Sequence, residues 1–142
     1  MIVDSSALVA LVFREPAHER VIDAAVAADW LGIGAPTLAE TGIVLAARIG
    51  EAAGPALALL LEHLDLRVVP FEALHARVAR EAFRRYGRGR HSAELNFGDC
   101  LTYAVAKVAR LPLLFVGDDF AQTDLEPGLR PAPTPRPSEP DV

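Results

Sequence analysis

Cysteine is nearly absent from this chain of 142 residues, and other features are missing as well. The single cysteine, Cys100, excludes an intramolecular disulfide and is typical of a protein from a reducing compartment. The amino terminus reads Met-Ile-Val-Asp, without the basic segment that opens a secretory signal. The longest apolar stretches are interrupted by Asp29, Glu40 and Arg48, so we expect no membrane span. These absences predict a soluble cytoplasmic protein.

Basic residues are also scarce, with 14 Lys and Arg against 19 Asp and Glu and a net charge of −5. This balance argues against binding nucleic acid over the whole surface. No GxGxxG or GxxxxGK[ST] loop occurs, so nucleotide binding of those kinds is unsupported. A local basic patch can still hold phosphates, although a solvated helix face has the same pattern. The patch comprises Arg77, Arg80, Arg84, Arg85, Arg88 and Arg90.

The length fits one domain, and short apolar segments alternate with pairs of helical segments. This order predicts an α/β fold in which helices cover both faces of a parallel sheet. The expected strands are residues 2–3, 31–35, 66–69 and 113–116. The expected helices are residues 7–12, 16–29, 36–49, 56–64, 71–86 and 96–110. We assign residues 1–126 to the domain and 127–142 to a proline-rich tail that we expect to be disordered.

Several local features accompany these elements. Ser5 or Ser6 is expected to cap the first helix, and Asn96 to cap the last. Gly87 is expected to end the arginine-rich helix, and residues 87–95 to form a mobile loop. The histidines lack metal-ligand spacing and are expected at the surface. They are His18, His63, His75 and His91.

Acidic residues follow the predicted strands or open the predicted helices. Asp4 ends the first strand, and Asp118 and Asp119 follow the last. Glu40 and Asp99 lie near the starts of two helices. In parallel α/β sheets, ligands bind beyond the carboxyl ends of the strands. Carboxylates gathered there repel one another by about 3 kcal/mol per pair at ~5 Å and an effective dielectric of about 20, so such a group normally holds a divalent cation.

The chemistry that these acids favour is hydrolysis of a phosphodiester. Mg²⁺ and Mn²⁺ prefer oxygen ligands and keep several waters, and they activate both the phosphate and the attacking water. Each acid also has a structural explanation. Asp4 could cap a helix, Asp99 could favour a helix dipole, and Asp118 or Asp119 could cap a turn. Glu40, on a largely apolar helix, is the hardest to explain in that way.

Four short segments carry a more specific pattern. They are Met-Ile-Val-Asp-Ser-Ser-Ala (1–7), Pro-Thr-Leu-Ala-Glu (36–40), Asn-Phe-Gly-Asp-Cys (96–100) and Leu-Leu-Phe-Val-Gly-Asp-Asp-Phe (113–120). In this order and spacing the chain resembles PIN-domain ribonucleases, and more narrowly the VapC toxins of bacterial type II toxin–antitoxin pairs. The resemblance implies a three-layer α/β/α sandwich with a central parallel sheet and Mg²⁺- or Mn²⁺-dependent endonucleolytic cleavage of RNA. It also implies neutralisation by a VapB-type antitoxin and a toxin homodimer.

The resemblance also implies roles for individual acids. Carried over by position, Asp4 and Asp99 are the principal metal ligands, and Glu40 completes the metal shell or orients the water. Asp118 is implied as the fourth acid, with Asp119 as its rival, because Gly-Asp-Asp-Phe departs from the usual Thr-x-Asp form of that motif.

Further expectations concern Ser6, the substrate and the partners. Ser6 is implied to hydrogen-bond the site. We expect the RNA backbone, from tRNA or rRNA, to lie on Arg84, Arg85, Arg88 and Arg90. An antitoxin helix is expected to dock on the apolar faces of the first helices and to offer a basic residue to the carboxylates. The alternatives are a PIN-type nuclease of RNA processing or DNA repair without a toxin role, or a non-catalytic nucleic-acid-binding module.

Overall fold

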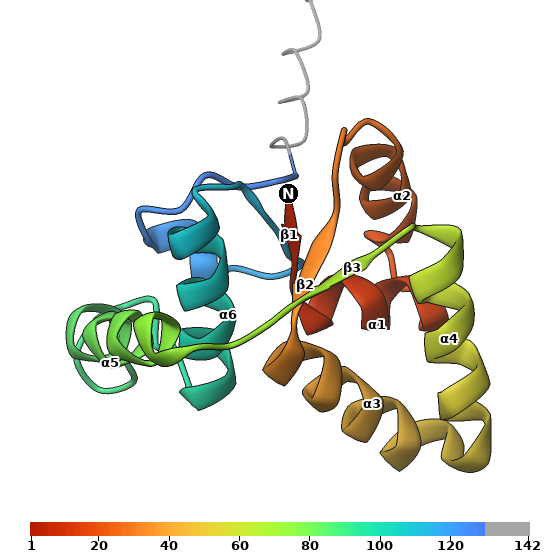
Figure 1. The fold of residues 1–142 in the computed structure, drawn as a ribbon, viewed down its shortest axis with the longest axis horizontal. Coiled ribbons are helices and arrows are strands. Elements are labelled where there is room, and N and C mark those ends of the chain that lie inside the picture. The colour runs from red at the N-terminus through yellow and green to blue at the C-terminus, as the bar shows by residue number, and fades with distance from the viewer. Residues whose placement is uncertain (130–142) are drawn as a thin grey trace, which may run out of the picture.

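A parallel sheet forms the centre of the molecule in the computed structural model, which describes residues 1–129 (Figure 1). Its four strands have the order β3-β2-β1-β4 within that part of the chain. They are β1 (Ile2–Val3), β2 (Gly32–Gly34), β3 (Arg67–Val69) and β4 (Leu113–Leu114). The two interior strands are β2 and β1, and in β1 Ile2 is paired with Gly32 on one side and with Leu113 on the other. The chain therefore brings its first and last strands together.

Helices cover both faces of this sheet. They are α1 (Ser5–Phe13), α2 (His18–Val26), α3 (Ala35–Ile49), α4 (Ala53–His63), α5 (Ala73–Tyr86) and α6 (Phe97–Ala109), with short 3₁₀ turns η1 (Gly50–Ala52) and η2 (Asp119–Gln122). Figure 1 shows α5 and α6 on one side of the strands and α1, α2 and α4 on the other. This arrangement confirms the predicted α/β/α sandwich with a central parallel sheet.

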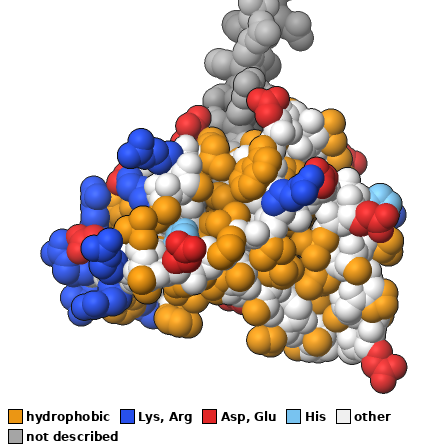
Figure 2. All heavy atoms as spheres, in the orientation of Figure 1, with side chains coloured by type: hydrophobic (Ala, Val, Ile, Leu, Met, Phe, Trp, Pro, Cys, Tyr) orange, Lys and Arg blue, Asp and Glu red, His pale blue; other side chains and the backbone are white. Residues whose placement is uncertain are grey.

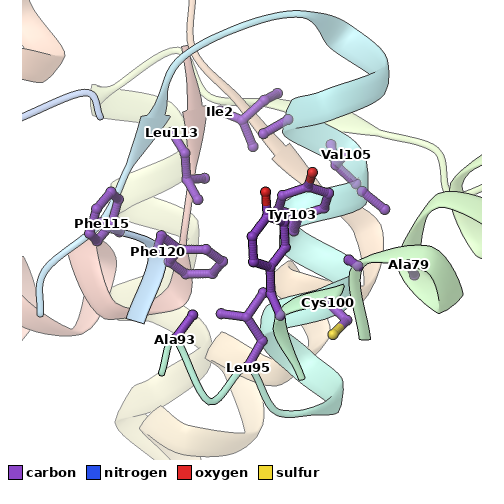
Figure 3. Packing of buried hydrophobic residues seen from close by; sticks show 14 residues of the cluster. Ile2, Ala79, Ala93, Leu95, Cys100, Tyr103, Val105, Leu113, Phe115 and Phe120 are labelled. Atoms are coloured by element: carbon purple, nitrogen blue, oxygen red, sulfur yellow. The ribbon is translucent and has the colours of Figure 1, made fainter. Parts of the chain in front are cut away.

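Each face of the sheet has its own apolar core, because successive strand residues point to opposite faces. Ile2 and Leu113 belong to the core beneath α5 and α6, where Figure 3 shows them close to Tyr103. Their neighbours Val3 and Leu114 belong to the core beneath α1, α2 and α4. Full burial of one such aliphatic side chain stabilises the fold by about 1.5–3 kcal/mol, so both cores hold the short strand β1 in place.

The carboxyl ends of the strands meet the amino ends of α1, α3 and α6 at one edge of the sheet, the lower edge in Figure 1. Gly34 ends β2 and caps α3 directly, without an intervening loop. A Cβ on Gly34 would lie 2.8 Å from Cγ2 of Val105 in α6, so glycine allows β2 and α6 to approach. This close approach brings the start of α3 beside α6.

The segment 35–63 is apolar and long enough to cross a membrane if it were one helix, with a mean hydropathy of 1.6 in its most apolar window. From the charges at Glu40 and Arg48, the sequence had predicted that no segment here would be apolar enough to span a membrane. The structure breaks this segment at Gly50, whose φ of 57° ends α3, and α4 then packs against α3. The resulting helix pair exposes 71% of Ile43 and 54% of Leu59.

Two helix caps correct the sequence expectations. Ser5 and Ser6 do not cap α1; its N-cap is Asp4, which confirms the capping role considered for that residue, because its extended backbone lets the carboxylate accept the amide of Ser6. His75 is buried rather than at the surface. Its Nδ1 accepts the amide of Glu72 at 3.0 Å, so the ring completes a capping box at the start of α5. Asn96 caps α6, as predicted.

Residues 87–95, expected as a mobile loop, form a turn closed by main-chain hydrogen bonds. The amide of Arg88 donates to the carbonyl of Leu95, and the amide of Leu95 donates to the carbonyl of Tyr86, both at 3.0 Å. Leu95 is fully buried. The turn is therefore anchored on the same core as α5 and α6.

The start of the predicted tail lies against the sheet. The amide of Gly128 donates to the carbonyl of Leu113 at 2.6 Å, and Pro127 forms an isolated parallel bridge with Leu113. Residues 127–129 thus adjoin the edge strand β4. The rest of that tail, residues 130–142, lies outside the described residues.

Candidate active site

Asp4 occupies the centre of the carboxyl edge, immediately after β1, and only 6% of it is exposed. Its Oδ2 accepts hydrogen bonds from the amide and the hydroxyl of Ser6, at 3.0 and 2.6 Å. The hydroxyl oxygen of Ser6 in turn accepts the amide of Val116 at 3.0 Å. Ser6 therefore ties the carboxylate of Asp4 to the end of β4, and it hydrogen-bonds the site as the resemblance implied.

Asp99 is held by the first turn of α6. Its Oδ2 accepts the amide of Asn96 at 2.8 Å, and Oδ1 of Asn96 accepts the amide of Asp99 at 2.9 Å. This reciprocal capping box satisfies two free amides of the helix end and fixes the Asp99 side chain. Among the described residues, Oδ1 of Asp99 has no hydrogen-bond partner and is available to a ligand.

Glu40 reaches from α3 to α6 and lies against the main chain of Gly98. A Cβ on Gly98 would stand 2.6 Å from Oε1 of Glu40 and 3.1 Å from its Cδ. Glycine at position 98 leaves room for the carboxylate in this position, at the positive end of α6. Sequence reasoning gave Gly98 no role. The available signal was a glycine in the first turn of a helix, where it costs roughly 0.5–1 kcal/mol relative to alanine.

The carboxylates of this edge act on one another electrostatically. Burial raises the pKa of Glu40, and the charges of Asp4 and Asp99 raise it further, against the opposing effect of a hydrogen bond with Ser5. Three acids that are far apart in the sequence are therefore close enough to repel one another. Repulsion of this kind disfavours the charged forms until a cation or a proton relieves it.

Asp99 is affected by a wider set of charges. Burial raises its pKa, the hydrogen bond from Asn96 opposes this, and the charges of Asp4 and Asp119 raise the pKa further. The cation of Arg88 acts in the lowering direction. Asp119 is thus the fourth acid within electrostatic range of this group.

Asp118 is placed differently from Asp119. The chain turns at Gly117, with φ at 104°, and Asp118 then becomes the N-cap of η2. Its carbonyl accepts the amide of Ala121 at 3.1 Å. Within residues 1–129, Asp118 is not among the charges that act on Asp99. The charges of Asp4 and Asp119 thus act on Asp99, and those of Asp4 and Asp99 act on Glu40, while Asp118 and Asp119 are both exposed.

The site can be tested for its fit to a metal ion. Among residues 1–129, no three carboxylate, imidazole or thiol groups converge closely enough to hold an ion as the side chains stand. The donor chemistry nevertheless fits a hard cation, because all the groups are carboxylates, and burial together with repulsion from neighbouring carboxylates raises the pKa of Glu40 and of Asp99. Mg²⁺ typically takes only one or two carboxylates and keeps waters in its remaining positions, so Asp4 and Asp99 suffice as direct ligands.

The four arginines expected to bind RNA have different surroundings. Arg84 is paired with Glu81, with its Nε 2.9 Å from Oε2, and Arg85 approaches Asp124 at 3.4 Å. Both are thereby engaged with acidic side chains outside the carboxylate group. Figure 2 shows the Lys and Arg side chains gathered at the end of the molecule where α5 lies.

The remaining two arginines, Arg88 and Arg90, lie within the turn 87–95. Arg88 is the cation that acts on Asp99. Arg90 lies over the ring of Phe83, 5.5 Å from its centroid. The arginine whose charge acts on Asp99 therefore comes from this turn and not from the middle of α5.

Cys100 has no part in this chemistry. It is 3% exposed, as predicted for a buried small residue. Burial raises the pKa of its thiol to about 11, and the charge of Asp99 adds to the effect. The thiol therefore stays protonated at neutral pH and is a poor nucleophile.

Residues 1–126 match the PIN domain family. The chain is 51% identical over 127 residues to Ribonuclease VapC36 of Mycobacterium tuberculosis, covering 89% of this chain and 91% of that protein. Among solved structures, VapC20 of M. tuberculosis, described as a Sarcin-Ricin loop cleaving toxin, has a TM-score of 0.74 at 22% identity, covering 92% of this chain and 98% of that one. VapBC2 from Rickettsia felis, bound to a DNA fragment from their promoter, has a TM-score of 0.65 at 14% identity, with coverages of 89% and 94%.

Proposed function

The chain belongs to the PIN-domain family and, within it, to the VapC ribonucleases, and from this membership we propose that it is a metal-dependent endoribonuclease and the toxin of a toxin–antitoxin pair. The family expected from the four sequence segments is thereby confirmed. The observation that carries the metal-dependent mechanism is that Asp4, Glu40 and Asp99 lie at the carboxyl edge of the sheet, near enough for their charges to act on one another.

Asp4 and Asp99 are assigned as the metal ligands. Both are held by hydrogen bonds on Oδ2, from Ser6 and from Asn96, so their positions are set before any ligand arrives. A Mg²⁺ or Mn²⁺ ion bound there supplies a Lewis acid for the phosphodiester and lowers the pKa of a water molecule. Fixed carboxylates are what such a site requires, because a preorganised charge has no reorganisation cost during the reaction.

Glu40 is assigned to the water. Its raised pKa makes it a stronger base than an ordinary glutamate, and its carboxylate lies against the main chain of Gly98. In hydrolysis, the water oxygen bonds to phosphorus as the bond from phosphorus to the leaving oxygen breaks. Asp119 is assigned as the fourth acid in preference to Asp118, because its charge reaches Asp99.

The substrate is proposed to be RNA of the tRNA or rRNA class. VapC20, a relative in fold, is described as cleaving a Sarcin-Ricin loop. In this chain, Arg88 and Arg90 lie on a turn beside the acids and are suited to phosphates. Arg84 and Arg85 are assigned a lesser part, because each is already paired with an acid.

The proposed partners are a VapB-type antitoxin and a second copy of the chain. A solved structure with a TM-score of 0.64 is described as a toxin–antitoxin complex from Klebsiella pneumoniae. Two apolar surfaces suit such contacts, both remote from the arginines. One is on α2, where Ile22 and Val26 are 44% and 79% exposed, and the other is on α4, where Leu59 is 54% exposed. We assign the antitoxin helix to the first surface and the homodimer contact to the second. The proposed location of the protein is the cytoplasm.

The test is cleavage of a mixed tRNA and rRNA pool by the purified chain, with Mg²⁺ or Mn²⁺ and with EDTA. Asp99→Asn, which removes the charge and keeps the shape, is run beside it. Discrete fragments that disappear with EDTA and with the variant are expected. Fragments that persist in EDTA would exclude the metal-dependent mechanism, and no cleavage by folded protein would favour a non-catalytic binding module.

The toxin role has a separate test. Expression of the unmodified chain should arrest bacterial growth, and Asp99→Asn should not. Co-expression of a small gene that neighbours this one should restore growth. Cleavage in the absence of growth arrest would instead favour a PIN nuclease of RNA processing or DNA repair.

A further inference from the structure

A hollow of about 740 Å³ lies between α5 and α6, next to the carboxylates. A second hollow, of about 540 Å³, lies between α3 and α6. Phe97 and Leu101 line both, and Glu40 and Gly98 line the second. The apolar lining therefore continues from the hollow between α5 and α6 to Glu40 in the acidic site. The larger hollow has room for a planar aromatic ring.

Exposed aromatic rings line the larger hollow. Phe97, the first residue of α6, is 78% exposed, although it is two residues from Asp99. Phe83 on α5 is 40% exposed, and Phe71 completes the lining. A large apolar ring left in water at the rim of a hollow marks a binding surface rather than a core position.

Cations surround the same hollow. Arg80 is among its lining residues, and no acidic side chain in the part of the chain that the structure describes forms an ion pair with it. Arg90 lies over the ring of Phe83. Figure 2 shows hydrophobic side chains beside this group of cations. A ligand of the hollow must therefore offer both a flat apolar surface and negative charge.

The charge of the acidic site makes additional contacts to RNA necessary. The chain carries a net charge of −5, and the carboxylates repel a phosphate backbone before a metal ion has bound. RNA must therefore be held by contacts beside the acids. Proteins that bind single-stranded RNA combine aromatic rings for the bases with cations for the phosphates, which is the combination found here.

We propose that this hollow receives one unstacked base of single-stranded RNA beside the phosphodiester that is cut. The base stacks on Phe97 and Phe83, and Arg80 holds the adjoining phosphate. A base drawn out of its stack bends the backbone toward Asp99, which lies one residue beyond Gly98. This proposal rests on the proposed ribonuclease function and names how that site selects an unpaired nucleotide.

The test compares two probes in a chain carrying Asp99→Asn to prevent cleavage. One is a single-stranded RNA of random sequence, and the other is an abasic RNA of equal length with the same phosphates. The chain should bind the first roughly 5- to 100-fold more tightly, as expected when one base is stacked. Phe97→Ala should abolish this preference, and Phe97→Trp should retain it. Arg80→Ala should weaken binding of both probes alike.

Val68→Ala is the matched control, since Val68 is 48% exposed on β3 and lines neither hollow. It should leave the preference intact. The proposal is wrong if Phe97→Ala weakens both probes equally or neither. It is also wrong if the unmodified chain has no base preference, or if Phe97→Ala changes the mass in analytical ultracentrifugation or loosens an antitoxin complex, because the hollow would then be a protein contact.

The two proposals fail separately. The chain with intact Asp99 is tested for cleavage of the RNA pool in the same conditions. Cleavage without a Phe97-dependent base preference overturns only the base-binding hollow. A Phe97-dependent base preference without cleavage supports the hollow and counts against the ribonuclease function.

Discussion

The carboxylate of Glu40 rests on the main chain of Gly98, so that a Cβ at position 98 would stand 2.6 Å from Oε1. This contact joins α3 to the first turn of α6. It fixes where the charge of Glu40 lies relative to Asp99. The contact is made by the end of a flexible side chain, so the carboxylate is able to move away if the space is filled.

Gly98→Ala is therefore expected to reduce cleavage without unfolding the protein. The methyl group displaces the Glu40 carboxylate by about 1 Å, a misplacement that costs up to about 100-fold in rate. Stability should change by no more than about 1 kcal/mol, because alanine also favours the helix. Cleavage rate and urea denaturation are the measurements. Gly54→Ala is the matched control, since Gly54 is likewise second in its helix and a Cβ there meets nothing within 4 Å.

The two aspartates after β4 should respond unequally to loss of charge. Asp119→Asn is expected to reduce cleavage by roughly 10- to 100-fold, because its carboxylate acts on Asp99 and so on the metal site. Asp118→Asn should stay close to the unmodified rate. Cleavage rates at saturating Mn²⁺ decide between them. A larger loss for Asp118→Asn would reverse the assignment of the fourth acid.

Ser6→Ala should destabilise the fold and slow cleavage together. It removes the hydroxyl that donates to Asp4 and leaves the amide of Val116 without its acceptor, at a cost of about 1–3 kcal/mol. Urea denaturation at neutral pH measures the loss. Ser92→Ala, which removes an exposed hydrogen bond to Gln122, should have little effect. Equal losses in both variants would show that the Ser6 bridge has no special weight.

Asp124 is expected to make stability depend on acid pH. It accepts hydrogen bonds from Tyr103 at 2.6 Å and from Lys107 at 2.8 Å. Burial acts to raise its pKa, but these hydrogen bonds and the charges of Lys107 and Arg85 prevail and place the pKa below 3.8. The stabilisation is therefore complete above 3.8 and is lost as the pH falls through the lowered pKa.

Asp124→Asn tests this dependence. The variant should be less stable than the unmodified chain at neutral pH by about 1 kcal/mol, because the pair is largely solvated. The difference should shrink as the pH falls well below 3.8, where Asp124 is protonated in both states. Denaturation by urea at both pH values is the measurement. A difference that is independent of pH would assign the loss to packing rather than charge.

Arginines that are paired with an acidic side chain should contribute less to RNA binding than Arg88. Arg88→Ala is expected to weaken RNA binding and to reduce the slope of log affinity against log salt by about 0.7, the value for one phosphate contact on a single strand. Arg84→Ala should leave the slope unchanged, because Arg84 is held by Glu81. Binding titrations at several salt concentrations provide the slopes. An unchanged slope for Arg88→Ala would remove this residue from the RNA path.

Much of the site could be predicted because it follows from topology. A strand that ends in an aspartate places that carboxylate at the carboxyl edge of a parallel sheet, whatever the details of packing. Asp4 is positioned in this way by β1. Asn96 and Asp99 have the spacing of a capping box, so their geometry is also local and readable from the sequence.

Other features depend on contacts that no local pattern encodes. The positions of Asp118 and Asp119 depend on the turn at Gly117 and on the 3₁₀ turn η2 that follows it. The closeness of Glu40 to Gly98 results from the approach of α3 to α6 across β2. His75 is buried because it completes a helix cap, a role usually held by Glu or Gln, so its residue type pointed the other way.

The bridge from Ser6 to Val116 spans 110 residues of sequence. During synthesis on the ribosome, the amino-terminal acids emerge long before the strand that completes their surroundings. Until β4 has left the exit tunnel and paired with β1, Ser6 lacks the amide of Val116 and Asp99 lacks Asp119. A nascent chain in which β4 has not yet paired with β1 therefore lacks the contacts that hold Asp4 in place and the charge that acts on Asp99.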